Sequence, residues 1–180
     1  MSQTERALSI RQPWAELILQ GRKTIELRTW ETDYRGPFWL HAGKAADLDL
    51  DRRFDVPDPP RGAFVGRITL VDISPIDAQR WELWRGQHLD SGRYQPGLFA
   101  WHLSSAERLR QPVPAPGRLN LFKIDEELAR RLHAELALRR PALNRRPGRT
   151  RRRPRGLRTR PTRAPAPPGT RSWGRRRCAA

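Results

Sequence analysis

The sequence has few of the side chains that build metal centres and disulfides. Cysteine occurs once, as Cys178 near the C-terminus, and the four histidines are scattered along the chain. A single cysteine excludes a disulfide within the chain and a cysteine-based zinc site, and the histidines show no metal-ligand spacing. We therefore expect neither a metal nor a cofactor.

Long apolar runs are also missing. No segment approaches the roughly 18 consecutive apolar residues that suggest a membrane span. The N-terminal "MSQTERALSI" carries polar and acidic groups where a signal peptide would need a basic and then an apolar stretch. These absences predict a cytoplasmic protein with no membrane partner.

Acidic residues are absent from the last part of the chain. Residues 139–180 contain 16 of the 36 basic residues, all of them Arg, and none of the 19 acidic residues. The remaining 20 basic and 19 acidic residues give residues 1–138 a formal charge of +1. The whole-chain charge of +17 therefore says little about the predicted domain at 1–138, although a local basic cleft can still bind nucleic acid.

The tail at 139–180 also has seven Pro and few large apolar groups. Such a segment cannot bury enough apolar surface to offset its chain entropy, so we expect it to be disordered. One interpretation is an arm that binds nucleic acid non-specifically through its arginines. The other is a GC-rich gene read in a shifted frame, so that the tail is not native-frame sequence. Both interpretations stay open.

The first elements are predicted by their periodicity. Residues 13–20 predict a helix with Trp14, Leu17 and Ile18 on one apolar face, and Gly21 suits its C-terminal cap. Residues 24–30 alternate between apolar and polar side chains, which predicts a strand.

Further short strands and one longer helix complete the predicted domain. Strands are predicted at 36–42, 62–73, 97–104 and 118–124, with a helical turn and loop at 45–61, a proline linker at 111–116 and a helix at 125–138. Gly66 inside the second of these strands suggests a β-bulge. The pattern favours an α+β fold built on a small β-barrel or curled sheet with packed helices.

The stretch "GRKTIELRTW" brings Lys23, Glu26 and Arg28 within six residues. The strand periodicity places Glu26 and Arg28 on one face, and Lys23 at the preceding turn can reach them. Taken alone, such a run is typical of a solvated, salt-bridged strand face. The alternative is a ligand cleft.

A wider pattern favours the cleft. "SIRQPWAELILQGRKTIELRTW", followed by "YRGPFWLHAGK", resembles the ASCH domain, the activating signal cointegrator homology domain of the PUA-like superfamily. The shared pattern G-x-K-x-x-E-x-R is matched in full by Gly21, Lys23, Glu26 and Arg28. Cointegrator-type flanks are also present: Gln12-Pro13-Trp14, Trp30 and Arg35-Gly36. The resemblance covers roughly residues 7–136.

The resemblance implies a PUA-like small β-barrel with surrounding helices and a cleft between helix and barrel. It also implies binding of RNA, other nucleic acid or a nucleoside-like ligand, in the setting of translation or transcription coactivation. The residues expected to contact the ligand are Lys23, Glu26, Arg28, Trp30, Arg35, Lys44 and Trp14.

These residue types suit a nucleotide. A carboxylate at Glu26 can accept hydrogen bonds from a base, Arg28 offers a planar fork, and Lys23 offers a point charge. Trp14 or Trp30 could stack on an unpaired base, although Trp14 also fits the core. His41 alternates with core positions and is expected either to face the cleft or to play a structural role.

An enzymatic alternative uses the same cleft. Some relatives are similar to small amidohydrolases that act on acetylated cytidine, which would assign catalysis here to Lys23, Glu26 and Thr24. The family's nucleophilic threonine corresponds to Glu26 in this chain, and Thr24 lies two residues earlier. This departure argues against amide hydrolysis. A ribonuclease that uses Lys23, Glu26 and Arg28 is a further alternative, and no Ser-His-Asp arrangement is visible in the sequence.

Overall fold

The structure is a computed structural model that describes residues 4–138. The predicted tail at 139–180 lies outside the described residues. In chain order the elements are β1 (Arg6–Ile10), α1 (Trp14–Leu19), β2 (Ile25–Arg28), β3 (Gly36–Ala42), α2 (Leu48–Arg53), β4 (Ala63–Pro75), α3 (Ala78–Leu83), α4 (Arg85–His88), β5 (Phe99–Pro114), β6 (Leu121–Lys123) and α5 (Glu126–Ala137).

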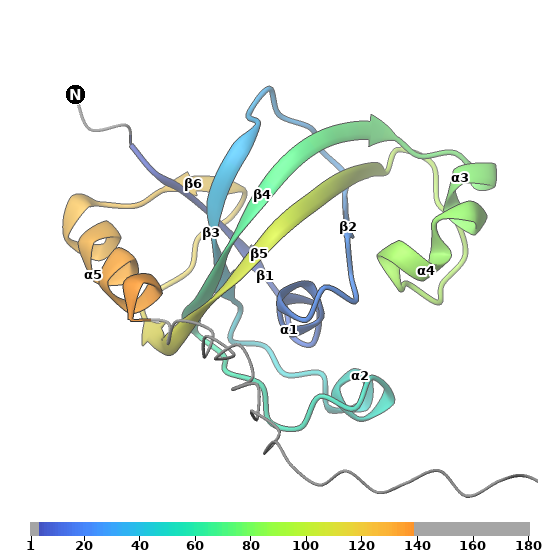
Figure 1. The fold of residues 1–180 in the computed structure, drawn as a ribbon. Helices are drawn as coiled ribbons and strands as arrows, with labels where there is room; N and C mark the ends of the chain where they lie inside the picture. The colour runs from blue at the N-terminus through green and yellow to red at the C-terminus, as the bar shows by residue number, and fades with distance from the viewer. Residues whose placement is uncertain (1–3, 139–180) are drawn as a thin grey trace, which may run out of the picture. The chain divides into compact units, whose positions relative to one another are not determined.

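Within residues 4–138 the strands form one six-stranded sheet in the order β2-β5-β4-β3-β1-β6. β1 and β3 run parallel, and the other neighbouring strands are antiparallel. The sheet curls into a half-barrel, with α5 on one side and α3 and α4 at the far end of the long strands (Figure 1). The predicted α+β class is confirmed.

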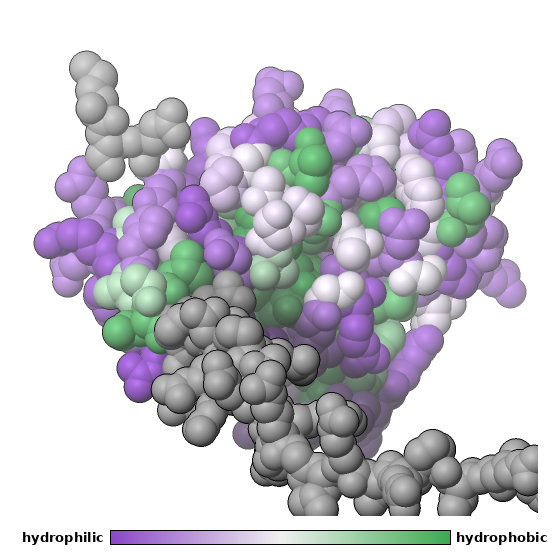
Figure 2. Space-filling model, viewed as in Figure 1, coloured by the Kyte–Doolittle hydropathy of each residue, from purple (hydrophilic) through white to green (hydrophobic). Residues whose placement is uncertain are grey.

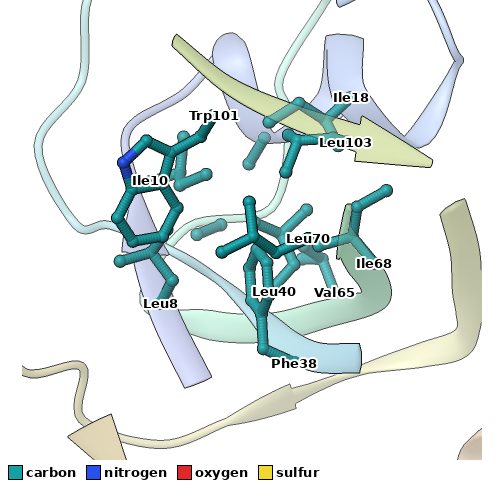
Figure 3. Close-up of a cluster of buried hydrophobic side chains, with 12 residues drawn as sticks. Leu8, Ile10, Ile18, Phe38, Leu40, Val65, Ile68, Leu70, Trp101 and Leu103 are labelled. Atoms are coloured by element: carbon teal, nitrogen blue, oxygen red, sulfur yellow. The ribbon is translucent and has the colours of Figure 1, made fainter. Parts of the chain in front are cut away.

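Period-2 alternation divides the buried side chains between the two faces of the sheet. One cluster fills the inside of the curve and includes Leu8 and Leu40, together with Ile18 from α1 (Figure 3). The other lies under α5 and includes their strand neighbours Ala7 and Trp39. α1 is therefore held against the inner face by its apolar stripe.

Two strands depart from the sequence prediction. β1 was not predicted, because five residues next to a stronger helix signal carry little periodicity. β5 runs on to Pro114 and includes much of the segment predicted as a proline linker. Val113 is buried in the α5-side cluster, and its burial holds this segment in the sheet although Pro112 and Pro114 lack N–H groups.

The bulge predicted at Gly66 is confirmed by a shift in the β4–β5 register between Phe64 and Gly66. A Cβ at this glycine would collide with the side chain of Leu19 and the main-chain carbonyl of Glu107. The missing side chain therefore lets α1 and β5 approach the bulge closely.

The segment between β4 and β5, for which no element was predicted, contains the short helices α3 and α4. Trp81 on α3 is buried and packs on His88 at the end of α4. No helix among the described residues is long and apolar enough to cross a membrane, and the face in Figure 2 is largely hydrophilic with scattered apolar groups.

Candidate functional site

A polar pocket of about 250 Å³ lies where the end of β1, the start of α1, strand β2 and the turn after α4 meet. It is lined by Ser9, Ile10, Arg11, Trp14, Lys23, Glu26, Leu27, Arg28, His88 and Asp90. Lys23, Glu26 and Arg28, the motif residues predicted to form a cleft, therefore lie together in one pocket.

The turn between α1 and β2 places the lysine. Gly21 adopts a left-handed φ of 73°, and the N–H groups of Arg22 and Lys23 both bond the carbonyl of Leu17, which ends the helix. The next residue, Thr24, donates its N–H to the carbonyl of Gln87. The chain around Lys23 is thus fixed to α1 on one side and to α4 on the other.

Lys23 is almost fully buried, with 4% of its surface exposed. Its Nζ donates to the carbonyl of His88 at 2.7 Å and lies 3.4 Å from Oε2 of Glu26. It also lies 5.0 Å from the centre of the Trp14 ring, a distance typical of a cation–π contact. Burial lowers the pKa of Lys23 below its usual 10.5, while the Glu26 carboxylate acts in the opposite direction.

Glu26 lies between two cations. Its Oε1 is 3.3 Å from Nη2 of Arg28, on the side away from Lys23. Nη2 of Arg28 also donates to the carbonyl of Ser9 at 3.0 Å, which ties β2 to the end of β1. Nε of the same side chain is buried and has no hydrogen-bond partner among residues 4–138.

The pocket therefore carries an excess of positive charge and a hydrogen-bond donor that has no partner among the described residues. Lys23 and Arg28 carry two positive charges against one carboxylate, and Arg11 adds an exposed guanidinium that pairs with no other described residue. Asp90 supplies the remaining acidic group of the pocket. Such an arrangement suits an anionic or hydrogen-bond-accepting ligand.

Trp14 lies at the wall of this pocket. It is half-buried, and its ring meets Phe54 edge-on at 5.2 Å between centroids. It therefore contributes both to packing and to the pocket, as the sequence left open.

Three residues predicted to contact the ligand do not line the pocket. Trp30 is partly buried and packs edge-on against Trp101 at 4.6 Å, at the edge of the inner core. Arg35 is exposed and lies 3.6 Å from Asp72, and Lys44 is exposed with its stem against Gly62. The structure therefore does not bring these three residues into the pocket around Lys23, because each is held by different neighbours, and their contact with a ligand stays a prediction.

The structure also places one residue of the catalytic alternative, Thr24, away from the pocket. Thr24 does not line the pocket, and its main chain bonds Gln87 and Leu103 on either side. The trio of Lys23, Glu26 and Thr24 is therefore not assembled around a common cavity.

His41 takes the structural role. It is buried, its Nε2 donates to the carbonyl of Ala115 at 3.0 Å, and its Nδ1 lies 3.1 Å from the hydroxyl of Ser9. Burial lowers the pKa of His41 below its usual 6.5. This Ser-His pair was not visible in the sequence. Gly117, in the segment after β5, packs directly on both side chains. The pair therefore fastens the segment after β5 to the sheet.

Sequence reasoning missed several pocket residues. Ser9 and Arg11 lie within the "SIRQPW" stretch that carries the family resemblance, which marks the region but not these positions. His88 and Asp90 carry no local signal, because they reach the pocket through long-range contacts such as the bond from Lys23 to the His88 carbonyl, 65 residues along the chain. Across residues 4–138 no three His, Cys, Asp or Glu side chains are grouped to hold a metal ion.

Comparison with known proteins identifies the family. The profile of the ASCH domain matches residues 8–113. The chain belongs to the ASCH domain family. The match includes the end of β1, the pocket and most of the sheet, so the resemblance inferred from the motif is confirmed.

Curated relatives include activating signal cointegrator 1 of Mus musculus, 29% identical over 136 residues, and that of Homo sapiens, 26% identical over 135. Each alignment covers 67% of this chain but only 22% of the relative, so the chain spans about a fifth of their length.

Solved structures share the fold. An ASCH protein from Zymomonas mobilis aligns with a TM-score of 0.55 at 16% identity, covering 73% of this chain and 94% of that protein. A single-residue variant of the same protein also aligns at 0.55. The predicted PUA-like architecture, a barrel-like sheet with surrounding helices, is therefore confirmed.

Proposed function

We propose that this ASCH domain binds single-stranded RNA and takes one nucleotide into the pocket around Lys23, Glu26 and Arg28. The observation that carries the proposal is the cation–carboxylate–cation network, which lines an open pocket and leaves the buried Nε of Arg28 without a hydrogen-bond partner among residues 4–138. An ion-pair network built only for stability would be expected to satisfy its buried donors.

The chemistry of the pocket matches a nucleotide. Glu26 can accept a hydrogen bond from an exocyclic amine, and Arg28 can donate to a base carbonyl or a phosphate. Trp14 provides an aromatic wall, and bases bind aromatic side chains in single-stranded RNA recognition. The exposed Arg11 at the rim is suited to a phosphate.

The size of the pocket supports a single nucleotide. At about 250 Å³ it lies below the roughly 300–1,000 Å³ typical of pockets for larger ligands. A duplex keeps its bases stacked inside, whereas a single strand can place one base into such a pocket. In line with the name of the curated relatives, we further propose that this binding serves transcription coactivation or translation.

Binding of a labelled single-stranded RNA by the full chain tests the proposal. Replacing Arg28 with Met should weaken binding by about 1–3 kcal/mol, roughly 5- to 150-fold, because a direct contact is lost. The affinity of Arg28→Lys should lie between those of wild type and Arg28→Met, since lysine keeps the charge but lacks the planar guanidinium. The matched control is Arg93→Gln, an exposed arginine that lines no part of the pocket.

Equal affinity of wild type and Arg28→Met would place RNA binding elsewhere. A circular dichroism melt of each variant separates a lost contact from a lost fold. Incubation with acetylcytidine tests the hydrolase alternative in the same samples. No turnover is expected, because Thr24 lies outside the pocket.

A further inference from the structure

Several exposed basic side chains have no hydrogen-bond, ion-pair or ring partner among residues 4–138. They differ from most arginines of the domain, which contact a carboxylate, a carbonyl or an aromatic ring, as Arg108 contacts Glu16. Five of them lie on segments that the structure brings together around the end of β1 and strand β6: Arg11, Lys44, Arg118, Lys123 and Arg131.

Three of these cations line a second groove of about 250 Å³. It lies between the segment after β5, strand β6 and the first turns of α5, and Arg118, Lys123 and Arg131 face it from these three elements. Of its two carboxylates, Asp125 already accepts the N–H of Leu128 as the cap of α5. Three cations against two carboxylates leave the groove an excess of one positive charge, and none of the three cations is paired with a described residue.

The groove and the nucleotide pocket share no lining residue, but their segments come close together at the end of β1. Ser9 lines the pocket, while its hydroxyl bonds His41 on the other side of the strand. Gly117 packs on this hydroxyl, and Arg118 follows it directly in the chain. The first cation of the groove is thus held close to the residue that bounds the pocket.

The same place also gathers the two remaining cations. β1 and β3 run parallel with Ile10 opposite Ala42, so Arg11 and Gly43 come next to each other where the strands end. Lys44 follows Gly43 and lies against Gly62. Gly62 in turn accepts the N–H of Ala115, which begins the segment that carries Arg118.

We propose that a single-stranded RNA with one nucleotide in the pocket continues over the end of β1 into this second groove, where Arg118, Lys123 and Arg131 bind its phosphates. The inference rests on the proposed function and adds a phosphate-binding site to it. Exposed, unpaired cations on separate elements recognise a chain of phosphates without reading its sequence. The pocket holds the base and the groove holds the backbone.

The test compares two RNA lengths in the full chain. The probes are cytidine monophosphate, which carries an exocyclic amine for Glu26 but is too short to reach from the pocket into the groove, and an oligocytidylate of about ten nucleotides, within the range that single-strand-binding domains cover. The variant carries Arg118→Gln, Lys123→Gln and Arg131→Gln together. The control carries Arg52→Gln, Arg93→Gln and Arg110→Gln, the same loss of charge at exposed sites that line neither pocket.

The groove variant should bind the monophosphate like wild type but the oligomer at least about tenfold more weakly. For this variant, the slope of log affinity for the oligomer against log salt should become shallower by about 2, since three phosphate contacts on a single strand contribute about 0.7 each. The control should retain most of the oligomer affinity. The tail is present in every protein, so its contribution cancels in the comparison.

Two results would overturn the inference alone, provided the monophosphate still binds and Arg28→Met weakens it. One is a groove variant that binds the oligomer like wild type, and the other is a control that loses as much oligomer affinity as the groove variant. If wild type binds neither probe, or if Arg28→Met changes the affinity for neither probe, the proposed function fails and the inference fails with it.

Discussion

The buried pair of Lys23 and Glu26 gives a prediction about stability that does not depend on any ligand. Lys23 is 4% exposed, the Glu26 side chain is 10% exposed, and their charged atoms lie 3.4 Å apart. Removing one partner of a buried pair costs about 3–5 kcal/mol, because the other charge is left without compensation. Since Arg28 also contacts Glu26 and is 22% exposed, we expect Glu26→Gln to lower the free energy of unfolding by about 3 kcal/mol.

Removing both charges should cost less than the sum of the single changes. Lys23→Met combined with Glu26→Gln leaves neither side chain with an uncompensated charge, so the double-mutant cycle should give a coupling of about 1–3 kcal/mol. Urea unfolding of the four full-length proteins at pH 7 measures it. The control cycle uses Asp49→Asn and Arg52→Gln, an exposed pair on α2 expected to couple by less than about 0.5 kcal/mol.

The direction of the pH dependence provides a second readout. Burial lowers the pKa of Lys23, so above this folded pKa the unfolded chain binds more protons at this position than the native state. The Lys23 contribution to stability should therefore rise with pH from the folded pKa up to the unfolded value of 10.5. In Glu26→Gln this rise should begin at lower pH. A Lys23–Glu26 coupling no larger than that of the control pair would refute the buried network.

Three further predictions concern packing, protonation and the tail. Gly66→Ala should lower the free energy of unfolding by about 1–3 kcal/mol because its Cβ would meet backbone and a packed leucine, whereas Gly86→Ala in α4, with open space around it, should be neutral or slightly stabilising in the same urea titration. Burial lowers the pKa values of His41 and His88, so their contribution to stability should fall as pH drops below about 6.5, and His41→Gln should flatten a series of melts between pH 7 and 5. Removing residues 139–180 should make RNA binding less salt-dependent and leave the loss caused by Arg28→Met unchanged, and loss of that effect would show that the tail carries the binding.

Local patterns predicted the parts of the fold that short-range periodicity decides. The apolar stripe of α1, the Gly21 cap and the alternation of β2 each depend on a few neighbouring residues, and the structure has all three. The same alternation placed Glu26 and Arg28 on one face, so the centre of the pocket could be predicted from the sequence.

Long-range packing decided what the sequence could not show. Trp30 lies beside the motif, but its ring packs against the buried Trp101, 71 residues away, and so faces the core. His88 reaches the pocket through a comparable long-range contact with Lys23. In β5 the burial of Val113 outweighs the strand-breaking tendency of its proline neighbours. None of these outcomes has a signature within one window of sequence.

Photo-crosslinking tests the central claim most directly, because it reports where the RNA lies. A single-stranded RNA substituted with 4-thiouridine would be irradiated with the full chain, and the crosslinked peptides would be located by mass spectrometry. We predict crosslinks in the peptides that carry Arg11, Trp14 and Arg28, and their loss in Arg28→Met. Crosslinks confined to residues 139–180 and unchanged in that variant would contradict binding in the pocket.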